Sequence, residues 1–221
     1  MTRLLKVQAV NSYSCNGGSV TMATHIPKVP YRFPGQLESE DFNLYDRLLQ
    51  ERLIFLNQAV DSDIANQTIA AMLYLDAEDT GCDIRLYINS QGGSGRESLT
   101  AGLAIYDTLQ CLSSDVVTIC NGTATGAAAF LLAMGTSGKR LALTHARILL
   151  KQPTHVINER SVTEINIEAR EVLQLRQILA KTLAQRTQQT VEKILEDTER
   201  DFYLSAQEAL DYGLIDQIIS R

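Results

Sequence analysis

The sequence lacks a hydrophobic run long enough to cross a membrane, because no stretch of 18 apolar residues occurs among its 221 residues. It also lacks a basic cluster: lysine and arginine are scattered, and the formal net charge is −6. These two absences argue against a membrane-spanning protein. They also argue against nucleic acid or an anionic membrane surface as a partner.

Cysteine is scarce and follows no metal-ligand pattern. Cys15, Cys82, Cys111 and Cys120 form no CxxC pair and have no ligand spacing with the three histidines. We therefore expect neither a metal site nor a cofactor, and free thiols fit a reducing compartment. Cys111 follows a predicted helix and Cys120 ends an apolar strand, so both are expected to be buried.

Proline is rare except near the N-terminus. Pro27, Pro30 and Pro34 exclude a continuous helix or a central strand there, so residues 1–36 are predicted to form a mobile arm. Residues 37–221 are predicted to form a single domain, which is an ordinary length for one α/β domain.

The first 25 residues carry basic and hydroxyl side chains but no acid, so a short organelle transit peptide is an open alternative. The absence of a long leader favours the bacterial cytoplasm, with the plastid stroma as the alternative.

After the arm, short apolar strands alternate with amphipathic helices, which argues for parallel βα units in an α/β fold. Ser205 with Glu208 three residues later is a capping box, and Gly213 is predicted to end that helix. The expected strands are residues 83–89, 115–120, 139–143, 147–150 and the C-terminal LIDQIIS, and the main helices are residues 62–75, 100–112, 126–134, 162–186 and 205–212.

Two glycine-containing turns follow strands of the predicted sheet. The first, INSQGGSG, includes Gly92 and Gly93, and the second, CNGTATGAAAF, leads from a strand into a helix. Hydrolases place a serine at the crest of such a strand-to-helix turn, where this chain has Gly126. Taken alone, the first turn is better explained as an ordinary tight turn and the second as close packing of the backbone.

In this order, the stretches YINSQGGSG, NGTATGAAAFLLAMG, HARILLKQP and DTERDFYLSAQEAL resemble the peptidase family of the Clp protease, ClpP. The resemblance runs from about Leu44 to Ile219. It implies the α/β, crotonase-like fold of that family, with repeated βα units forming a compact head and a protruding handle helix at about residues 162–186.

Mapped through the resemblance, Gly126 stands at the family's serine, Lys151 at its histidine and Asp201 at its aspartate. Gly126 has no atom to deprotonate, and Lys151 lacks the two ring nitrogens of imidazole. This degenerate triad is similar to that of ClpR, the proteolytically inactive branch of the family. The positions matching the oxyanion hole are Gly92, Gly93 and Ala127.

The resemblance implies a non-catalytic structural subunit that assembles with active ClpP-type subunits into heptameric rings, two of which stack. Glu199 and Arg200 are the suspected ring-to-ring contacts. An AAA+ unfoldase and unfolded polypeptide are the implied partners, and residues 28–40, with Tyr31 and Phe33, match the family's axial gate.

Several alternatives stay open on the sequence. A Thr125–Lys151 pair is conceivable as a displaced nucleophile and base of an active peptidase, and Lys151 is a candidate ion-pair partner of Asp201. The extra residues Gly95–Ser98 are expected beside the substrate groove. An acyl-CoA enzyme of the same broad fold is a third possibility, although no signature for CoA is found.

Overall fold

The computed structural model describes residues 26–31, 40–153 and 161–220. The chain divides into two compact units, residues 1–44 and residues 45–221.

The first unit contains a two-stranded antiparallel ribbon, β1 (Lys28–Tyr31) with β2 (Glu40–Asn43). Part of the arm that was predicted to be irregular is therefore a strand. Pro30 is tolerated because both strands of a two-stranded ribbon are edge strands. Tyr31 meets Phe42 edge to face, with ring centroids 6.3 Å apart.

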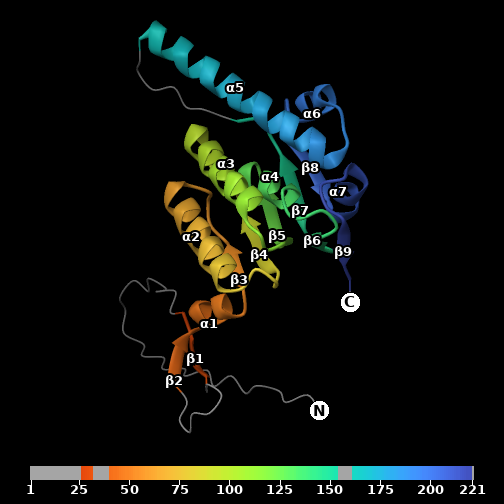
Figure 1. Cartoon of the computed structure of the whole chain (residues 1–221). Coiled ribbons are helices and arrows are strands. Elements are labelled where there is room, and N and C mark those ends of the chain that lie inside the picture. Colours follow the sequence, from red (N-terminus) through yellow and green to blue (C-terminus); the bar gives the residue numbers. More distant parts are fainter. Residues whose placement is uncertain (1–25, 32–39, 154–160, 221) are drawn as a thin grey trace, which may run out of the picture. The chain divides into compact units, whose positions relative to one another are not determined.

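The second unit is built on a seven-stranded sheet, shown in Figure 1. The order is β3-β4-β5-β6-β9, and β7 pairs with both β5 and β8. All pairs in this sheet are parallel except β7 with β8. The strands are β3 (Leu53–Leu56), β4 (Ile84–Ser90), β5 (Val116–Thr125), β6 (Arg140–Leu143), β7 (Arg147–Leu150), β8 (Phe202–Ser205) and β9 (Gln217–Ile219).

Helices connect most of these strands, which confirms the predicted α/β class. The described helices are α1 (Leu44–Gln50), α2 (Ser62–Glu78), α3 (Gly95–Cys111), α4 (Ala127–Ala133), α5 (Val162–Thr187), α6 (Val191–Asp197) and α7 (Ala206–Tyr212). The capping box of Ser205 and Glu208 is present, and Gly213 ends α7 with a φ of 89°.

Two differences from the sequence prediction concern the neighbourhood of the turns, and two further elements were not foreseen. Helix α3 begins at Gly95 rather than at Thr100, and β5 continues to Thr125 rather than ending at Cys120. Helix α6 and strand β8 were not predicted, because each is short and they follow directly on the long helix α5.

Strand β5 pairs with different neighbours along its length. Residues 118–120 pair with residues 140–142 of β6, and residues 123–125 pair with residues 147–149 of β7. On its other side β5 pairs with β4 as far as Ser90 opposite Ala124. The carboxyl ends of β4, β5 and β7 therefore meet at one edge, where parallel sheets place their sites.

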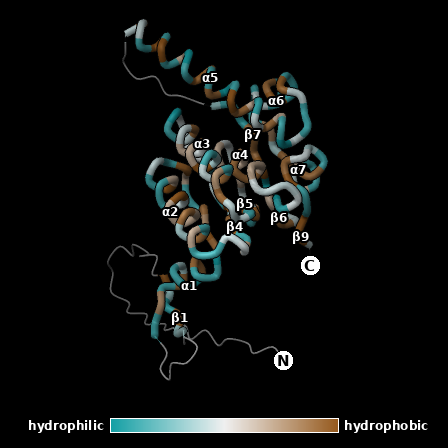
Figure 2. Tube along the Cα trace, viewed as in Figure 1, coloured by the Kyte–Doolittle hydropathy of each residue, from teal (hydrophilic) through white to brown (hydrophobic). Residues whose placement is uncertain are grey.

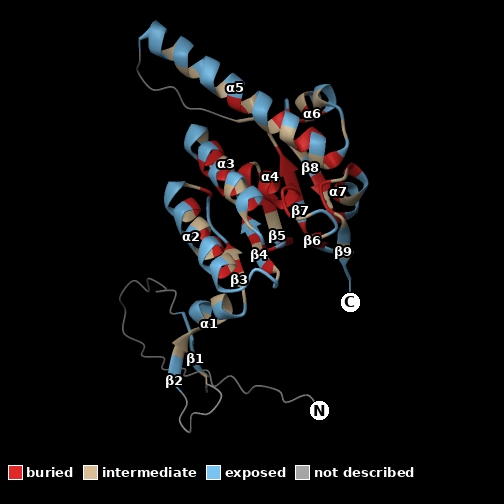
Figure 3. Cartoon of the chain, in the orientation of Figure 1, coloured by how far each residue is buried: buried red, intermediate tan, exposed pale blue. Residues whose placement is uncertain are grey.

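Helix α4 lies at the centre of the second unit and is buried along its whole length (Figure 3). Its first residues, Ala127, Ala128 and Ala129, are small, and Phe130 contacts Tyr106 edge to face with centroids 5.6 Å apart. Small side chains at the start of α4 let β5, α3 and the glycine turn approach it closely.

Helix α5 is buried only toward its C-terminal end. Its buried side chains are Leu175, Ala180, Leu183, Ala184 and Thr187. The preceding half extends beyond the sheet and carries apolar side chains on its surface (Figures 1 and 2), with Val162 75% exposed and Ile167 62% exposed. An amphipathic helix whose apolar residues lie uncovered needs a further partner to bury them.

Arg140 of β6 joins the ends of α5 and α7 to the sheet by hydrogen bonds and also forms an ion pair with Asp216. Arg140 Nε donates to Asp216 at 2.9 Å, and Arg140 Nη1 donates to the carbonyl oxygens of Arg186 and Gly213. The side chains of Arg140 and Asp216 are only 9% and 20% exposed. Burial by itself would raise the pKa of Asp216, but the hydrogen bonds from Arg140 outweigh it and hold that pKa below its ordinary value.

We expect Asp216→Asn to lower the free energy of unfolding at pH 7 by about 3 kcal/mol, because it leaves the Arg140 guanidinium buried without its anion. Because the pKa of Asp216 is depressed in the fold, its stabilisation is present above the unfolded pKa of about 3.9 and is lost as the pH falls below it. The difference between the two proteins should therefore shrink toward pH 3. Urea unfolding at equal protein concentration measures it, with the exposed Asp107→Asn as control, and an unchanged difference at pH 3 would contradict the assignment.

Candidate functional site

The crest of the second glycine turn is a sharp bend between β5 and α4. Gly126 has φ 54° and ψ −113°, its N–H donates to the Leu149 carbonyl oxygen, and its carbonyl oxygen accepts from Phe130 N, both at 2.9 Å. This backbone conformation is open to glycine and strained, by about 1–3 kcal/mol, for other residues. The predicted strand-to-helix turn is therefore present, with no side chain at its crest.

The first glycine turn packs directly against this crest. A Cβ at Gly92, whose φ is 75°, would overlap the carbonyl oxygen of Thr125 and lie 3.5 Å from Ala127 N. A Cβ at Gly93 would lie 2.5 Å from Ser98 Oγ and 2.7 Å from the Val60 carbonyl oxygen. The structure thus brings Gly92, Gly93 and Ala127 together, and close packing accounts for both glycines. Their role as an oxyanion hole stays a prediction.

Lys151 lies over the crest. A Cβ at Gly126 would be 3.1 Å from Lys151 Cε and 3.7 Å from Lys151 Cγ. The aliphatic part of the lysine therefore covers the position from which a nucleophile would project.

The antiparallel pairing of β7 with β8 brings together the two residues that the sequence analysis matched to the family's histidine and aspartate. Leu150 is paired with Phe202, so the next residues in each direction, Lys151 and Asp201, have adjacent backbones. The suggested ion pair between them is nevertheless absent from the described part of the chain. The physical reason is that Asp201 is exposed, so that water solvates its carboxylate and no counter-charge is required.

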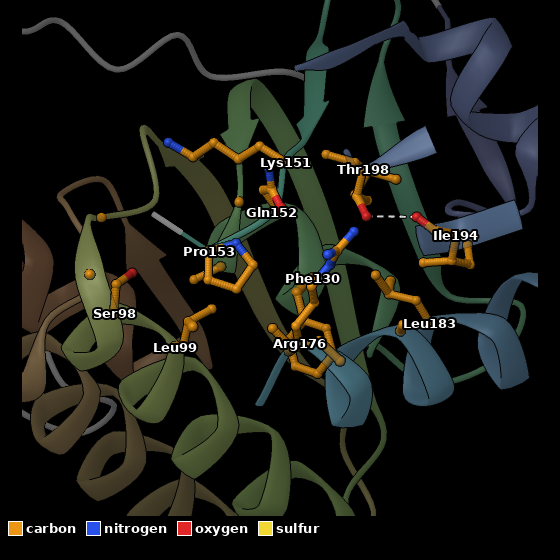
Figure 4. A pocket seen from close by; sticks show the side chains of 17 residues that line it. Ser98, Leu99, Phe130, Lys151, Gln152, Pro153, Arg176, Leu183, Ile194 and Thr198 are labelled. Carbon is orange, nitrogen blue, oxygen red and sulfur yellow. Dashed lines mark hydrogen bonds between the residues drawn. The ribbon is translucent and has the colours of Figure 1, made fainter. Parts of the chain in front are cut away.

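The crest opens into a pocket, seen from close by in Figure 4. Gly93, Gly126, Ala127 and Lys151 line it, and α5 supplies its other side. The cavity has a volume of about 50 Å³, which is room for a short side chain rather than for a cofactor. The apolar lining includes Leu99, Phe130, Leu150, Leu179, Leu183 and Ile194.

The segment after β7 is held in place by its backbone and one amide. Gln152 N donates to the Thr198 carbonyl oxygen at 3.0 Å, and Gln152 Nε2 donates to the Glu199 carbonyl oxygen at 2.9 Å. The loop that joins α6 to β8 therefore positions the lysine segment. Glu199 and Arg200 are exposed, and their role as ring-to-ring contacts stays a prediction.

The extra residues Gly95–Ser98 form the first turn of α3, a regular structure that the sequence analysis did not foresee. Gly95 and Ser98 line the pocket, and their place beside a substrate groove stays a prediction. Ser98 is 4% exposed, and its Oγ, buried against Gly93, has no hydrogen-bond partner among the described residues.

Sequence reasoning missed Arg176. It projects from α5 into the pocket lining and donates from Nη2 to the Leu195 carbonyl oxygen at 3.2 Å, and its buried Nε finds no partner in the part of the chain that the structure describes. The signal was available, because Arg176 stands three, four and seven residues before Leu179, Ala180 and Leu183, on the same helical face.

The displaced-nucleophile alternative is disfavoured by the position of Thr125. Its side chain is 4% exposed and does not line the pocket beside Lys151.

Cys120 is buried as predicted, and burial raises the pKa of its thiol to about 11. The prediction for Cys111 was wrong: the last residue of α3 is exposed.

Within the described ranges, no three or more His, Cys, Asp or Glu side chains are grouped so that they could hold a metal ion. No helix in the same ranges is both long enough and apolar enough to span a membrane.

Comparison with known proteins places this geometry in a family. The family model described as Clp protease matches residues 36–221. The chain is 53% identical over 195 residues to the ATP-dependent Clp protease proteolytic subunit 2 of Prochlorococcus marinus (strain NATL2A), covering 88% of this chain and 96% of that protein. It is equally similar, with the same coverage, to the ATP-dependent Clp protease proteolytic subunit 3 of Synechococcus sp. (strain CC9902).

Because Lys151 contacts the crest, the residues at positions 126 and 151 depend on each other. We expect Gly126→Ser alone to show no labelling by a fluorophosphonate probe, because the new side chain meets the lysine and finds no base. Lys151→His alone should also show no labelling, because Gly126 supplies no nucleophilic oxygen. Only the double variant should be labelled, since losing either serine or histidine from such a unit costs nearly as much, about 10⁶ in rate, as losing the whole triad.

Labelling is read by intact-protein mass, with the double variant carrying Asp201→Ala as the matched control. Labelling of Gly126→Ser alone would show that the interdependence is not real.

Proposed function

Because the chain belongs to the Clp protease family, we propose that it is a subunit of the Clp proteolytic core that performs no peptide hydrolysis itself. The single observation that carries the proposal is Gly126, which occupies the crest of the strand-to-helix turn without a side chain. Attack on an amide carbonyl requires an oxygen or sulfur nucleophile, a base that takes its proton, and a group that orients the base. This chain supplies the turn but no nucleophile.

The remaining polar groups do not replace the missing chemistry. Lys151 carries three donors and no acceptor when charged, so it cannot pass a proton between a hydroxyl and Asp201 as an imidazole does. Thr125, the nearest hydroxyl in sequence, is buried on β5. The site retains the architecture that surrounds a reaction and lacks the reacting atoms.

The proposed role is therefore structural. The chain would assemble with active ClpP-type subunits into heptameric rings, and two rings would enclose a chamber that receives unfolded polypeptide from an AAA+ unfoldase. The uncovered apolar side chains of α5 support an assembly role, because Val162, Ile167, Leu173 and Ile178 are between 47% and 75% exposed. Within this proposal the compartment is the bacterial cytoplasm, with the plastid stroma as the alternative.

The purified chain alone should give no fluorophosphonate labelling and no turnover of a fluorogenic peptide, because Gly126 offers nothing to acylate. Mixed with an active Clp proteolytic subunit, it should co-elute in one complex whose label resides only on the partner, as read by intact mass. Labelling of this chain that survives Gly126→Ala and disappears in Thr125→Ala would instead assign the displaced nucleophile.

The exposed part of α5 should carry the contact between rings. We expect Ile167→Asp to reduce the native mass of the mixed complex to about half, because a buried charge opposes the stacking of two rings. Native mass spectrometry gives the reading, and Gln185→Asp, an exposed polar position on the same helix, is the control. An unchanged mass for Ile167→Asp would exclude this face from the ring interface.

A further inference from the structure

The pocket beside the crest has an uneven charge. Among the described residues, its lining contains two cationic side chains, Lys151 and Arg176, and neither aspartate nor glutamate. The two come from different elements: Lys151 follows β7, and Arg176 projects from α5 on the other side of the pocket (Figure 4). Within the described residues neither forms an ion pair.

Of the two cations, Arg176 gives the stronger indication of a ligand, because most of its hydrogen-bond donors are unused within the described ranges. A guanidinium group has five N–H donors. Within the described residues one contact is made, from Nη2 to the Leu195 carbonyl oxygen, and the buried Nε has no partner. Because the buried Nε is closed to solvent, a ligand would meet the guanidinium through its terminal Nη groups, whose one contact within the described residues is that with Leu195. A carboxylate fits best, because its two oxygens match the fork of the guanidinium.

The surroundings strengthen such a contact. Leu99, Phe130 and Leu183 make the rest of the lining largely apolar, and a charge pair is stronger where water is excluded. The apolar lining also suits a hydrophobic side chain that neighbours the carboxylate in the ligand. The pocket therefore selects a chain that combines apolar and acidic groups.

We infer that this pocket binds a carboxylate of a peptide, through Arg176 and Lys151, and holds it without cleaving it. The inference rests on the proposed function, since a subunit of a proteolytic chamber meets peptides, and every cleaved peptide bond leaves a new C-terminal carboxylate. The shared chemistry is a peptide carboxylate, and its two sources are the chain terminus and an acidic side chain.

The test uses the purified full chain and fluorescein-labelled heptapeptides in an anisotropy titration. One peptide ends in a free leucine carboxylate, one is its C-terminal amide, and two further amides carry an internal glutamate or glutamine. We expect a carboxylate-bearing peptide to bind about tenfold more tightly than its uncharged match, the effect of one charge-assisted hydrogen bond. Preference for the free acid assigns the terminus, and preference for glutamate assigns an acidic side chain.

Variants locate the site. Arg176→Gln should abolish the preference, Arg176→Lys should retain part of it, and Arg170→Gln, an exposed arginine on the same helix outside the pocket, should leave it unchanged. Lys151→Gln provides a second variant if Arg176→Gln does not fold, as judged by circular dichroism.

The outcomes separate this inference from the function on which it rests. Three results would overturn the inference: equal binding of charged and uncharged peptides, a preference that survives both Arg176→Gln and Lys151→Gln, or no binding at all. Each of them would leave the proposed non-catalytic role intact. Chromatography of the same samples detects cleavage, and cleaved peptide would overturn the proposed non-catalytic role instead.

Discussion

The site depends on one close approach between two backbones. The glycine turn after β4 lies against the end of β5 so tightly that a Cβ at Gly92 would overlap the carbonyl oxygen of Thr125. That contact fixes the crest at Gly126 next to the glycine loop, and the buried helix α4 then starts from the crest. Because protein interiors resist small displacements, the arrangement persists whether or not a reaction is performed there.

A site can keep its shape while its chemistry changes. In this chain the crest, the glycine loop and the apolar pocket are retained, and a lysine stem covers the place where a nucleophile would project. The charge of the pocket is also unbalanced, since among the described residues two cations line it without a carboxylate. The pocket is therefore a concave, positively charged surface, which is a binding surface in physical terms.

Much of this fold could be predicted from the sequence, because alternation of apolar strands and amphipathic helices is a local signal. The capping box at Ser205 and the turn at Gly126 were located correctly, since both rest on local backbone chemistry. The strand at residues 28–31 was missed, because its pairing partner lies beyond an intervening segment. Short elements such as α6 carry too few residues to establish a period.

The site was predictable where a motif marks it and unpredictable where only packing does. Gly92, Gly126 and Lys151 stand in recognisable strings, and the structure brings them together. Arg176 belongs to a helix that is distant in sequence, and its place in the pocket follows from which face of α5 turns inward. The predicted ion pair between Lys151 and Asp201 was wrong. It assumed that the carboxylate is buried, and whether a carboxylate is buried depends on tertiary structure, which the sequence does not show.

The backbone conformation at the crest also bears on how such a chain changes over generations. A serine held at φ 54° and ψ −113° is under strain that a glycine escapes, so a nucleophile at this turn is maintained at the expense of stability. Once a subunit is released from hydrolysis, substitution by glycine relaxes the turn and is favoured by stability alone. The same preference then opposes the return of serine, and Lys151 over the crest opposes it sterically. Under the proposed function, loss of a nucleophile at this turn would therefore be difficult to reverse.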